Sequence, residues 1–320
     1  MHARSWRLWI PIYLVVTFAT GFADLHMRPH AVRAWTAYVP EVVDGTAEAP
    51  GRYRVLAPFL ERGFERASGL SPASAWYLTR LGWILAAYAV FHWYLRTWFE
   101  DGQAGAGTLL VAATLPLTFT NSWGHPDHFP ELALFTLGCL AAARRADMAF
   151  AAALVLAALN RETAGFLVGV YALAAPMDRA RLVRTVLFGL LFLVVFVGLR
   201  AARGFAMYDY WQLGRNLEFL ALLPPGYDPY YRAYAWFGVA LFGPLAWLAL
   251  TVRRQLPWFP RYVPLVAIPF VVVAFTLSSI IETRIFTPLF SLLVPAVMFA
   301  VFSADTTSGC LTGKRDGGIV

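Results

Sequence analysis

The sequence predicts an all-α, polytopic integral membrane protein with about ten transmembrane helices. The first observation is composition: 59% of the 320 residues are apolar, 14% are charged, and the mean hydropathy is +0.57. A soluble protein is about half apolar and a quarter charged, so this chain has too few polar residues to cover a water-facing surface. The other two observations are apolar runs separated by short polar breaks and arginines at alternate breaks.

The net charge of +7 does not indicate a nucleic-acid partner, because the basic residues are spread along the chain rather than clustered. Of these 26 residues, 25 are arginine, and their spread is typical of loops that set membrane topology. The two cysteines, Cys139 and Cys310, form neither a metal-binding pair nor a redox motif. Composition also excludes disordered and disulfide-rich classes.

The first apolar run, residues 8–23, follows a basic start and precedes no small-residue cleavage site. We therefore expect a retained first span rather than a signal peptide. Four of the ten runs are short, which suggests helices that end inside a protein-lined cavity. Residues 148–176 remain open to a second interpretation as one long span. The later runs are residues 76–95, 108–120, 129–143, 148–159, 163–175, 182–199, 234–252, 262–281 and 285–302.

Topology follows from where the arginines lie. Splitting the chain at Asn160 leaves both termini cytoplasmic and puts basic residues in every cytoplasmic loop, as the positive-inside rule requires. With nine spans the later basic loops would face outward. We therefore predict one multi-pass domain, residues 1–303, in a bacterial inner (plasma) membrane, and a disordered cytoplasmic tail, residues 304–320. The basic residues in question are Arg96, Arg144, Arg145, Arg179, Arg181, Arg184, Arg253, Arg254, Arg261, Lys314 and Arg315.

The predicted outer side holds two long loops, residues 24–75 and 203–233, and three short polar turns that begin at Asn121, Asn160 and Glu282. Ionisable groups at membrane depth are costly and usually face a cavity or a pathway. Their convergence on one face therefore predicts a functional site there. The second loop is rich in Tyr and Trp, which suits carbohydrate or acyl-chain binding and equally an interfacial aromatic belt.

Asp24 and His26 stand where the first span leaves the bilayer. A carboxylate in this place can accept a proton from a hydroxyl nucleophile, and a nearby imidazole can tune it. The alternative is an interfacial aspartate that only ends a helix.

Residues 51–66 predict an amphipathic interfacial helix at the end of the first long loop. Arg52, Tyr53 and Arg54 begin this segment and could hold a lipid-linked phosphate through charge-assisted hydrogen bonds. The alternative is that both arginines extend to lipid headgroups.

The segment HPDHFPE contains His125, Asp127, His128 and Glu131. Two histidines near carboxylates are compatible with a divalent metal, but the two prolines prevent a regular helical metal-binding face. A substrate-binding or catalytic turn is therefore favoured over metal. Helix capping by the carboxylates is the other alternative.

Two further turns place charges inside apolar sequence. Asn160, Arg161 and Glu162 interrupt one run, and Glu282 and Arg284 begin the last one. Arg161 could face an anionic phosphate with Glu162 orienting it, or the two charges could pair to hold broken helices together. Reciprocal pairs, Arg161 with Glu282 and Glu162 with Arg284, would satisfy both turns; the sequence does not choose between such pairings.

Taken together, these features resemble the GT-C superfamily of polytopic glycosyltransferases. The resemblance rests on the acidic end of the first span at Asp24, the long first loop with YRVLAP, many short spans, and RIFTPLFSLLVP late in the chain. YRVLAP, NRET and ETRIFTPL also resemble segments of uncharacterised bacterial membrane proteins of this kind. The resemblance implies a polyprenyl-phosphate-linked sugar donor, Asp24 as catalytic base and Arg284 as a phosphate ligand. The chain reads DLH at Asp24, without a DxD pair.

The resulting hypothesis is an inverting transfer of a sugar from a polyprenyl-phosphate donor to a lipid or glycan acceptor at the extracytoplasmic face. In it, Asp24 is the base and Arg52, Arg54, Arg161 and Arg284 neutralise the phosphate. The acceptor side would be completed by His125, Asp127 and His128. No cofactor is expected, and a divalent metal is possible but not favoured. The alternatives are a transporter or flippase for a lipid-linked or anionic solute and a metal-dependent hydrolase centred on His125 and His128.

Overall fold

The computed structural model describes residues 2–27, 31–119, 127–206, 211–220 and 229–302. Every regular element in these residues is helical, and helix accounts for 85% of the residues that the structure describes. The all-α prediction is therefore confirmed. The α-helices are α1 (His2–Met27), α2 (Ala31–Asp44), α3 (Leu56–Ser68), α4 (Pro72–Leu95), α5 (Asp101–Thr114), α6 (His128–Ala143), α7 (Asp147–Asn160), α8 (Phe166–Leu173), α9 (Arg179–Arg203), α10 (Leu213–Phe219), α11 (Pro229–Val252), α12 (Trp258–Tyr262), α13 (Ala267–Leu277) and α14 (Pro288–Phe302).

Short 3₁₀ turns extend or join several of these helices. Each of the ten predicted apolar runs overlaps an α-helix or a series of consecutive helical turns. The 3₁₀ turns are η1 (Gly51–Tyr53), η2 (Leu115–Phe119), η3 (Glu162–Gly165), η4 (Arg253–Gln255), η5 (Val263–Val266) and η6 (Thr283–Phe286).

Helix ends follow local sequence signals. Ser71 caps α4 by accepting a hydrogen bond from the backbone N–H of Ser74 at 3.3 Å, and Pro72 occupies the first turn. Asp178 caps α9 in the same way through the N–H of Arg181 at 2.7 Å. Gly69 ends α3 with a φ of +68°, a left-handed conformation that glycine adopts without steric cost.

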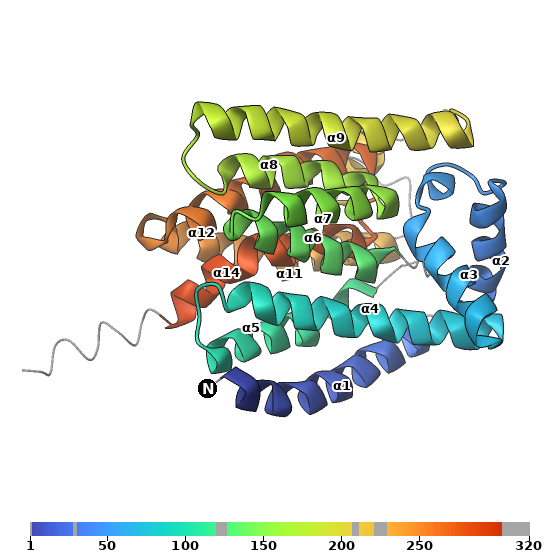
Figure 1. Cartoon of the computed structure of the whole chain (residues 1–320), viewed down its shortest axis with the longest axis horizontal. Coiled ribbons are helices and arrows are strands. Elements are labelled where there is room, and N and C mark those ends of the chain that lie inside the picture. Colours follow the sequence, from blue (N-terminus) through green and yellow to red (C-terminus); the bar gives the residue numbers. More distant parts are fainter. Residues whose placement is uncertain (1, 28–30, 120–126, 207–210, 221–228, 303–320) are drawn as a thin grey trace, which may run out of the picture.

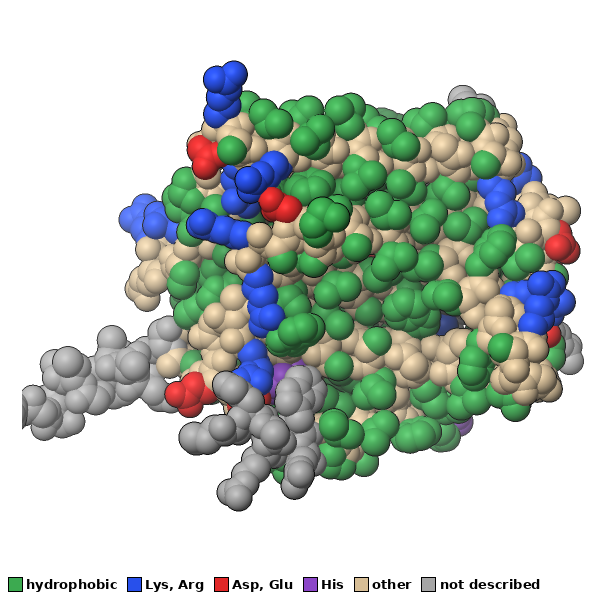
Figure 2. Space-filling view, viewed as in Figure 1, with side chains coloured by type: hydrophobic (Ala, Val, Ile, Leu, Met, Phe, Trp, Pro, Cys, Tyr) green, Lys and Arg blue, Asp and Glu red, His purple; other side chains and the backbone are tan. Residues whose placement is uncertain are grey.

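Within the described residues, four helical segments are long and apolar enough to cross a membrane. The remaining apolar helices are shorter, so the number of crossings stays a prediction. In Figure 2, the visible charged side chains lie toward the two ends of the molecule, and the band between them is largely hydrophobic. The four segments are Leu8–Met27, Arg179–Arg203, Ala233–Gln255 and Trp258–Leu277.

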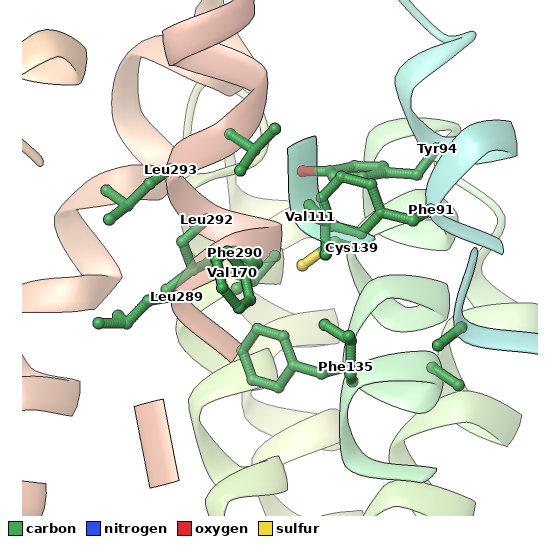
Figure 3. Packing of buried hydrophobic residues seen from close by; sticks show 14 of the residues in the cluster. Phe91, Tyr94, Val111, Phe135, Cys139, Val170, Leu289, Phe290, Leu292 and Leu293 are labelled. Atoms are coloured by element: carbon green, nitrogen blue, oxygen red, sulfur yellow. The ribbon is translucent and has the colours of Figure 1, made fainter. Parts of the chain in front are cut away.

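The long helices lie side by side, and the short helices α2 and α3 cover one end of the bundle (Figure 1). Helix α1 begins and α14 ends at the opposite end. Almost all of α6 is buried, between α4 and α7. Figure 3 shows Phe135 and Cys139 of α6 within the apolar core, with Phe91 of α4 and Phe290 of α14 nearby. The core therefore lies around α4, α6 and α14.

The chain reverses direction after Asn160. Asp147 at the start of α7 accepts a hydrogen bond from Tyr171 near the end of α8 at 2.7 Å, and it pairs with Arg184 of α9 at 3.0 Å. The start of α7 and the end of α8 therefore lie at the same end of the bundle. This geometry favours two short antiparallel helices over the alternative of one long span across residues 148–176.

Candidate functional site

Asp127 is the centre of a buried charge cluster at the end of the bundle covered by α2 and α3. Its carboxylate is paired with Arg54 at 2.8 Å, Arg284 at 3.5 Å and Arg161 at 3.7 Å. These three arginines come from segments far apart in the sequence: the residue after η1, the break after α7, and η6. Because Asp127 is only 1% exposed, the fold must bring several cations to it to offset the cost of burying its charge.

Three further carboxylates surround this centre. Glu131 in the first turn of α6 accepts a hydrogen bond from Arg161 at 2.6 Å and another from the Thr163 hydroxyl. Glu162 accepts one from Arg54 at 2.8 Å, and Glu282 pairs with Arg284. Among the residues that the structure describes, the cluster thus includes three guanidinium groups and four carboxylates, and each of these has an opposite charge beside it.

Local backbone structure explains how the break after α7 contributes to this cluster. Asn160 ends α7, and its side-chain amide donates to the backbone carbonyl of Asp127 at 2.8 Å. Arg161 then has extended backbone angles, φ −162° and ψ 147°, before η3 begins at Glu162. The polar break predicted from NRET is therefore a chain reversal that fixes the start of α6.

The observed ion pairs differ from the reciprocal pairs considered from sequence. Arg161 pairs with Glu131 and Asp127 rather than with Glu282, and Glu162 pairs with Arg54 rather than with Arg284 or Arg161. The physical reason is that residues of α6 and of the first long loop supply the nearest partners. Arg284 instead contacts its own neighbour Glu282.

A second ion pair lies beside the cluster. Asp24 is 1% exposed and accepts a hydrogen bond from Arg80 Nε of α4. Nη2 of the same guanidinium lies 3.4 Å from Nε2 of His128, the residue after Asp127. Arg80 also stacks over the rings of Trp76 and Phe129, 5.1 and 4.6 Å from their centroids. Asp24 is therefore connected to the Asp127 cluster through Arg80 and His128.

Arg80 was missed in the sequence analysis, although a signal was present. It is an arginine inside the apolar run of residues 76–95, and a charge in such a run requires a partner. The partner lies on α1, 56 residues earlier. Glu61 of α3 is a second missed group: it is buried and lines a small cavity together with Arg80.

Other predicted site residues lie outside the cluster. His26 is exposed and stacks on Phe22, with ring centroids 5.6 Å apart. Arg52 donates to the backbone carbonyl of Ala47 at 2.8 Å, and the Tyr53 hydroxyl donates to that of Gly204 at 2.8 Å. His125 lies outside the described residues. The segment predicted as an amphipathic interfacial helix is helical as η1 and α3, with Phe59, Leu60 and Phe64 exposed; its place at a membrane interface stays a prediction.

A partly open cavity of about 690 Å³ lies beside the Asp127 cluster, between η3, α8, α9 and α13. Its polar part is formed by Arg54, Arg161, Glu162 and Arg200, and Glu162 has 30% of its side chain exposed. Its apolar part is formed by Phe166, Phe192, Phe196, Phe270, Val273, Leu277 and Ile285.

The electrostatics keep Arg54 charged. Burial lowers the pKa of Arg54, but Glu162 and Asp127 outweigh this effect and raise it well above its usual value. Within the described residues, no three His, Cys, Asp or Glu side chains are grouped so that they could hold a metal ion. The carboxylates of the cluster face guanidinium groups instead.

The arrangement combines groups whose chemistry suits an amphiphile with an anionic or polyhydroxylated head and a long apolar chain. Guanidinium groups suit phosphate oxygens, carboxylates suit sugar hydroxyls, and the aromatic wall suits a hydrocarbon chain.

A comparison with protein-family models, with curated proteins and with solved structures finds no match for this chain.

Proposed function

We propose that this protein transfers a sugar from a polyprenyl-phosphate donor to a hydroxyl of a lipid or glycan acceptor. The observation that carries the proposal is the cavity of about 690 Å³, which joins an arginine- and glutamate-lined end to an aromatic and aliphatic wall. An isoprenoid chain would follow the apolar wall, and the sugar phosphate would lie against the charged end. The GT-C resemblance is consistent with this assignment.

The chemistry is a single displacement at the anomeric carbon. The acceptor oxygen forms the new glycosidic bond while the bond from the anomeric carbon to the phosphate oxygen breaks, and polyprenyl phosphate leaves with the bonding electron pair. The acceptor hydroxyl proton passes to a carboxylate. Negative charge grows on the leaving phosphate, and guanidinium groups fixed beforehand at this position stabilise it without rearranging.

Asp24 is the carboxylate that we propose as base, and the acceptor must reach it. It lies behind Arg80 and is 1% exposed, so the reaction requires Arg80 to move aside as the acceptor binds. Glu162 is the alternative base. The specific observation in its favour is that it lines the cavity directly.

For membrane placement, we propose ten crossings, both termini in the cytoplasm, and the Asp127 cluster at the extracytoplasmic face. The charges at the two ends of the bundle and the apolar band between them support this arrangement (Figure 2). Helix α9 forms the outer edge of the bundle and also one wall of the cavity (Figure 1), so a lipid-linked donor can approach from the bilayer beside it.

A carrier for the same lipid-linked anion is the second candidate function. The observation that favours it is that the polar end of the cavity is rich in charge while Asp24 lies outside the cavity lining. A carrier needs the binding surface but no base. It would release the donor unchanged, whereas a transferase leaves polyprenyl phosphate and a glycoside.

The test is sugar transfer by purified protein from a radiolabelled polyprenyl-phosphate sugar, with a crude membrane-lipid extract as acceptor. Loss of a general base lowers the rate roughly 10² to 10⁴-fold, and we expect a loss of this size for Asp24→Asn. Glu65→Gln, which alters a pair on the surface of α3, should retain full activity. Thermal unfolding in detergent shows whether each variant is folded.

Glu162→Gln decides between the two carboxylates. If Asp24→Asn is fully active and Glu162→Gln is inactive although folded, the base is Glu162. If both variants are fully active, a carboxylate base is refuted. Movement of intact donor into vesicles without glycoside formation would replace the transferase by the carrier.

A further inference from the structure

The three guanidinium groups that line the large cavity differ in one respect. Arg54 and Arg161 are both bonded to carboxylates, but Arg200, near the end of α9, has no carboxylate partner among the residues that the structure describes. Within the described part of the chain, it is the cavity cation that pairs with no carboxylate. Arg200 does not stand out in the sequence, because a basic residue at a helix end resembles the topology-setting arginines.

The charge balance of the Asp127 cluster makes this difference important. Among the described residues, three guanidinium groups there face four carboxylates, so these seven groups carry one more negative than positive charge. A phosphate that approached Arg54 or Arg161 would also approach Glu162, Asp127 and Glu131, and repulsion would offset the attraction. Arg200 is bonded to none of the described carboxylates, so an anion that binds there meets less direct repulsion.

Two aromatic rings hold the Arg200 guanidinium in place. Its Cζ lies 3.5 Å from the ring centroid of Phe196 and 4.4 Å from that of Tyr53. Its Nη1 donates to the backbone carbonyl of Phe196 at 3.3 Å. Stacking occupies the faces of the guanidinium plane and leaves edge N–H groups for a ligand, which suits bidentate binding of phosphate oxygens.

Tyr53 is itself fixed by the segment that follows α9. Its hydroxyl donates to the carbonyl of Gly204 and accepts from the N–H of Ala206, at 2.8 and 2.9 Å. The first long loop and the segment after α9 are thus hydrogen-bonded to each other beside Arg200. This arrangement limits the side-chain entropy that Arg200 loses when an anion binds.

We propose that Arg200 binds the phosphate of the ligand in this cavity, that Tyr53 is its positioning residue, and that Arg54 and Arg161 mainly hold the charged frame together. The ligand is a phosphate ester with a long apolar chain, which lies along Phe166, Phe192 and Phe270. The chemical class of this ligand rests on the proposed function, but the role of Arg200 rests on the contacts and the charge balance described above.

The experiment measures equilibrium binding to the purified full-length protein in detergent. Three probes are used: a radiolabelled polyprenyl monophosphate, the corresponding polyprenyl alcohol, and inorganic phosphate as competitor. We expect Arg200→Gln to weaken binding of the monophosphate roughly tenfold or more, the size of a lost charge-assisted hydrogen bond, and to leave binding of the alcohol unchanged. The matched control is Arg254→Gln, which removes one exposed arginine at the opposite end of the bundle and should bind like the native protein.

Tyr53→Phe keeps the ring and removes the hydroxyl anchor, so we expect a loss of a few-fold, again for the phosphate probe only. Competition by inorganic phosphate as effective as that by the monophosphate would show that the site recognises a free anion and would overturn the assignment of a lipid ligand. Equal binding of the monophosphate by native protein and Arg200→Gln would overturn the role of Arg200. The role of Arg200 would also be overturned if folded Arg54→Gln bound the monophosphate tenfold more weakly while Arg200→Gln bound it like the native protein.

These outcomes are independent of sugar transfer. A protein that binds the monophosphate through Arg200 but forms no glycoside refutes the proposed transferase activity and leaves this inference standing. A protein that forms glycoside at the native rate and affinity with Arg200→Gln refutes this inference and leaves the proposed function standing.

Discussion

Polar clusters occur at both ends of the bundle, and they differ in the interactions that join their members. The cluster around Asp127 joins four segments through buried charges and borders a cavity of about 690 Å³. The other joins α1, α4 and α5 through a chain in which the Tyr13 hydroxyl lies 2.6 Å from His92, and His92 lies 3.2 Å from Asp101.

Trp9 completes this second cluster by donating to Asp101 at 2.6 Å. Its members are packed against each other, and they line none of the cavities described above. Similar residue types thus serve packing at one end and form a ligand-sized cavity at the other. The composition of a polar cluster therefore does not show by itself whether the cluster borders a cavity.

Of the substitutions that test the difference between the two clusters, Asp127→Asn should lower the stability of the protein most. The substitution removes the central negative charge, and loss of one partner from a buried ion pair costs about 3 to 5 kcal/mol. The measurement is unfolding of the purified protein in detergent. Glu65→Gln, which breaks the surface pair with Arg62, is the control and should cost less than about 1 kcal/mol. Equal stability of Asp127→Asn and the native protein would mean that the cluster does not hold the fold together.

Gly105→Ala tests the packing at the other end. A Cβ built at Gly105 of α5 would lie 1.9 Å from the Trp9 ring, so the Trp9 side chain or α1 must shift, and overpacking of this kind costs about 1 to 3 kcal/mol. Gly102→Ala in the same helix is the matched control, because nothing lies within 4 Å of its Cβ position. It should be neutral or slightly stabilising. If both variants were equally stable, close packing of α1 against α5 would be disproved.

Tyr13→Phe should lower the stability of the protein least, and it tests whether the cluster around Tyr13 affects ligand binding. It removes the hydrogen bond to His92 without changing the shape of the ring, and the expected loss of stability is about 1 to 2 kcal/mol. Binding of polyprenyl monophosphate should be unchanged, because Tyr13, His92 and Asp101 are not among the residues that line the cavity. A loss of ligand affinity in the folded variant would show that the two ends are coupled.

Sequence reasoning was most successful where local pattern decides structure. Apolar runs locate the helices because a buried backbone must satisfy its own hydrogen bonds, and NRET marked a break that is present at Asn160 and Arg161. The same reasoning placed Asp127, Arg161 and Arg284 at one end of the bundle. It could not choose their partners, because the pairing depends on how helices are rotated and packed.

Arg80 and Arg200 show what sequence alone does not reveal. Each is an arginine in or at the end of an apolar helix, where sequence alone does not separate a topology signal from a site residue. Their environments separate them: Arg80 meets Asp24, and Arg200 meets two aromatic rings and a cavity.

By itself, the sequence determined that this chain is helical, that it is apolar enough for a membrane, and that its scarce charges gather in a few turns. These properties depend on residue type and spacing, which act over a few neighbouring positions. Only the tertiary structure decided that Arg54 meets Asp127 and Glu162, and that Arg200 faces the cavity without a carboxylate among the described residues. Those contacts join residues up to 157 positions apart in the Asp127 cluster, so they exist only once the helices have packed.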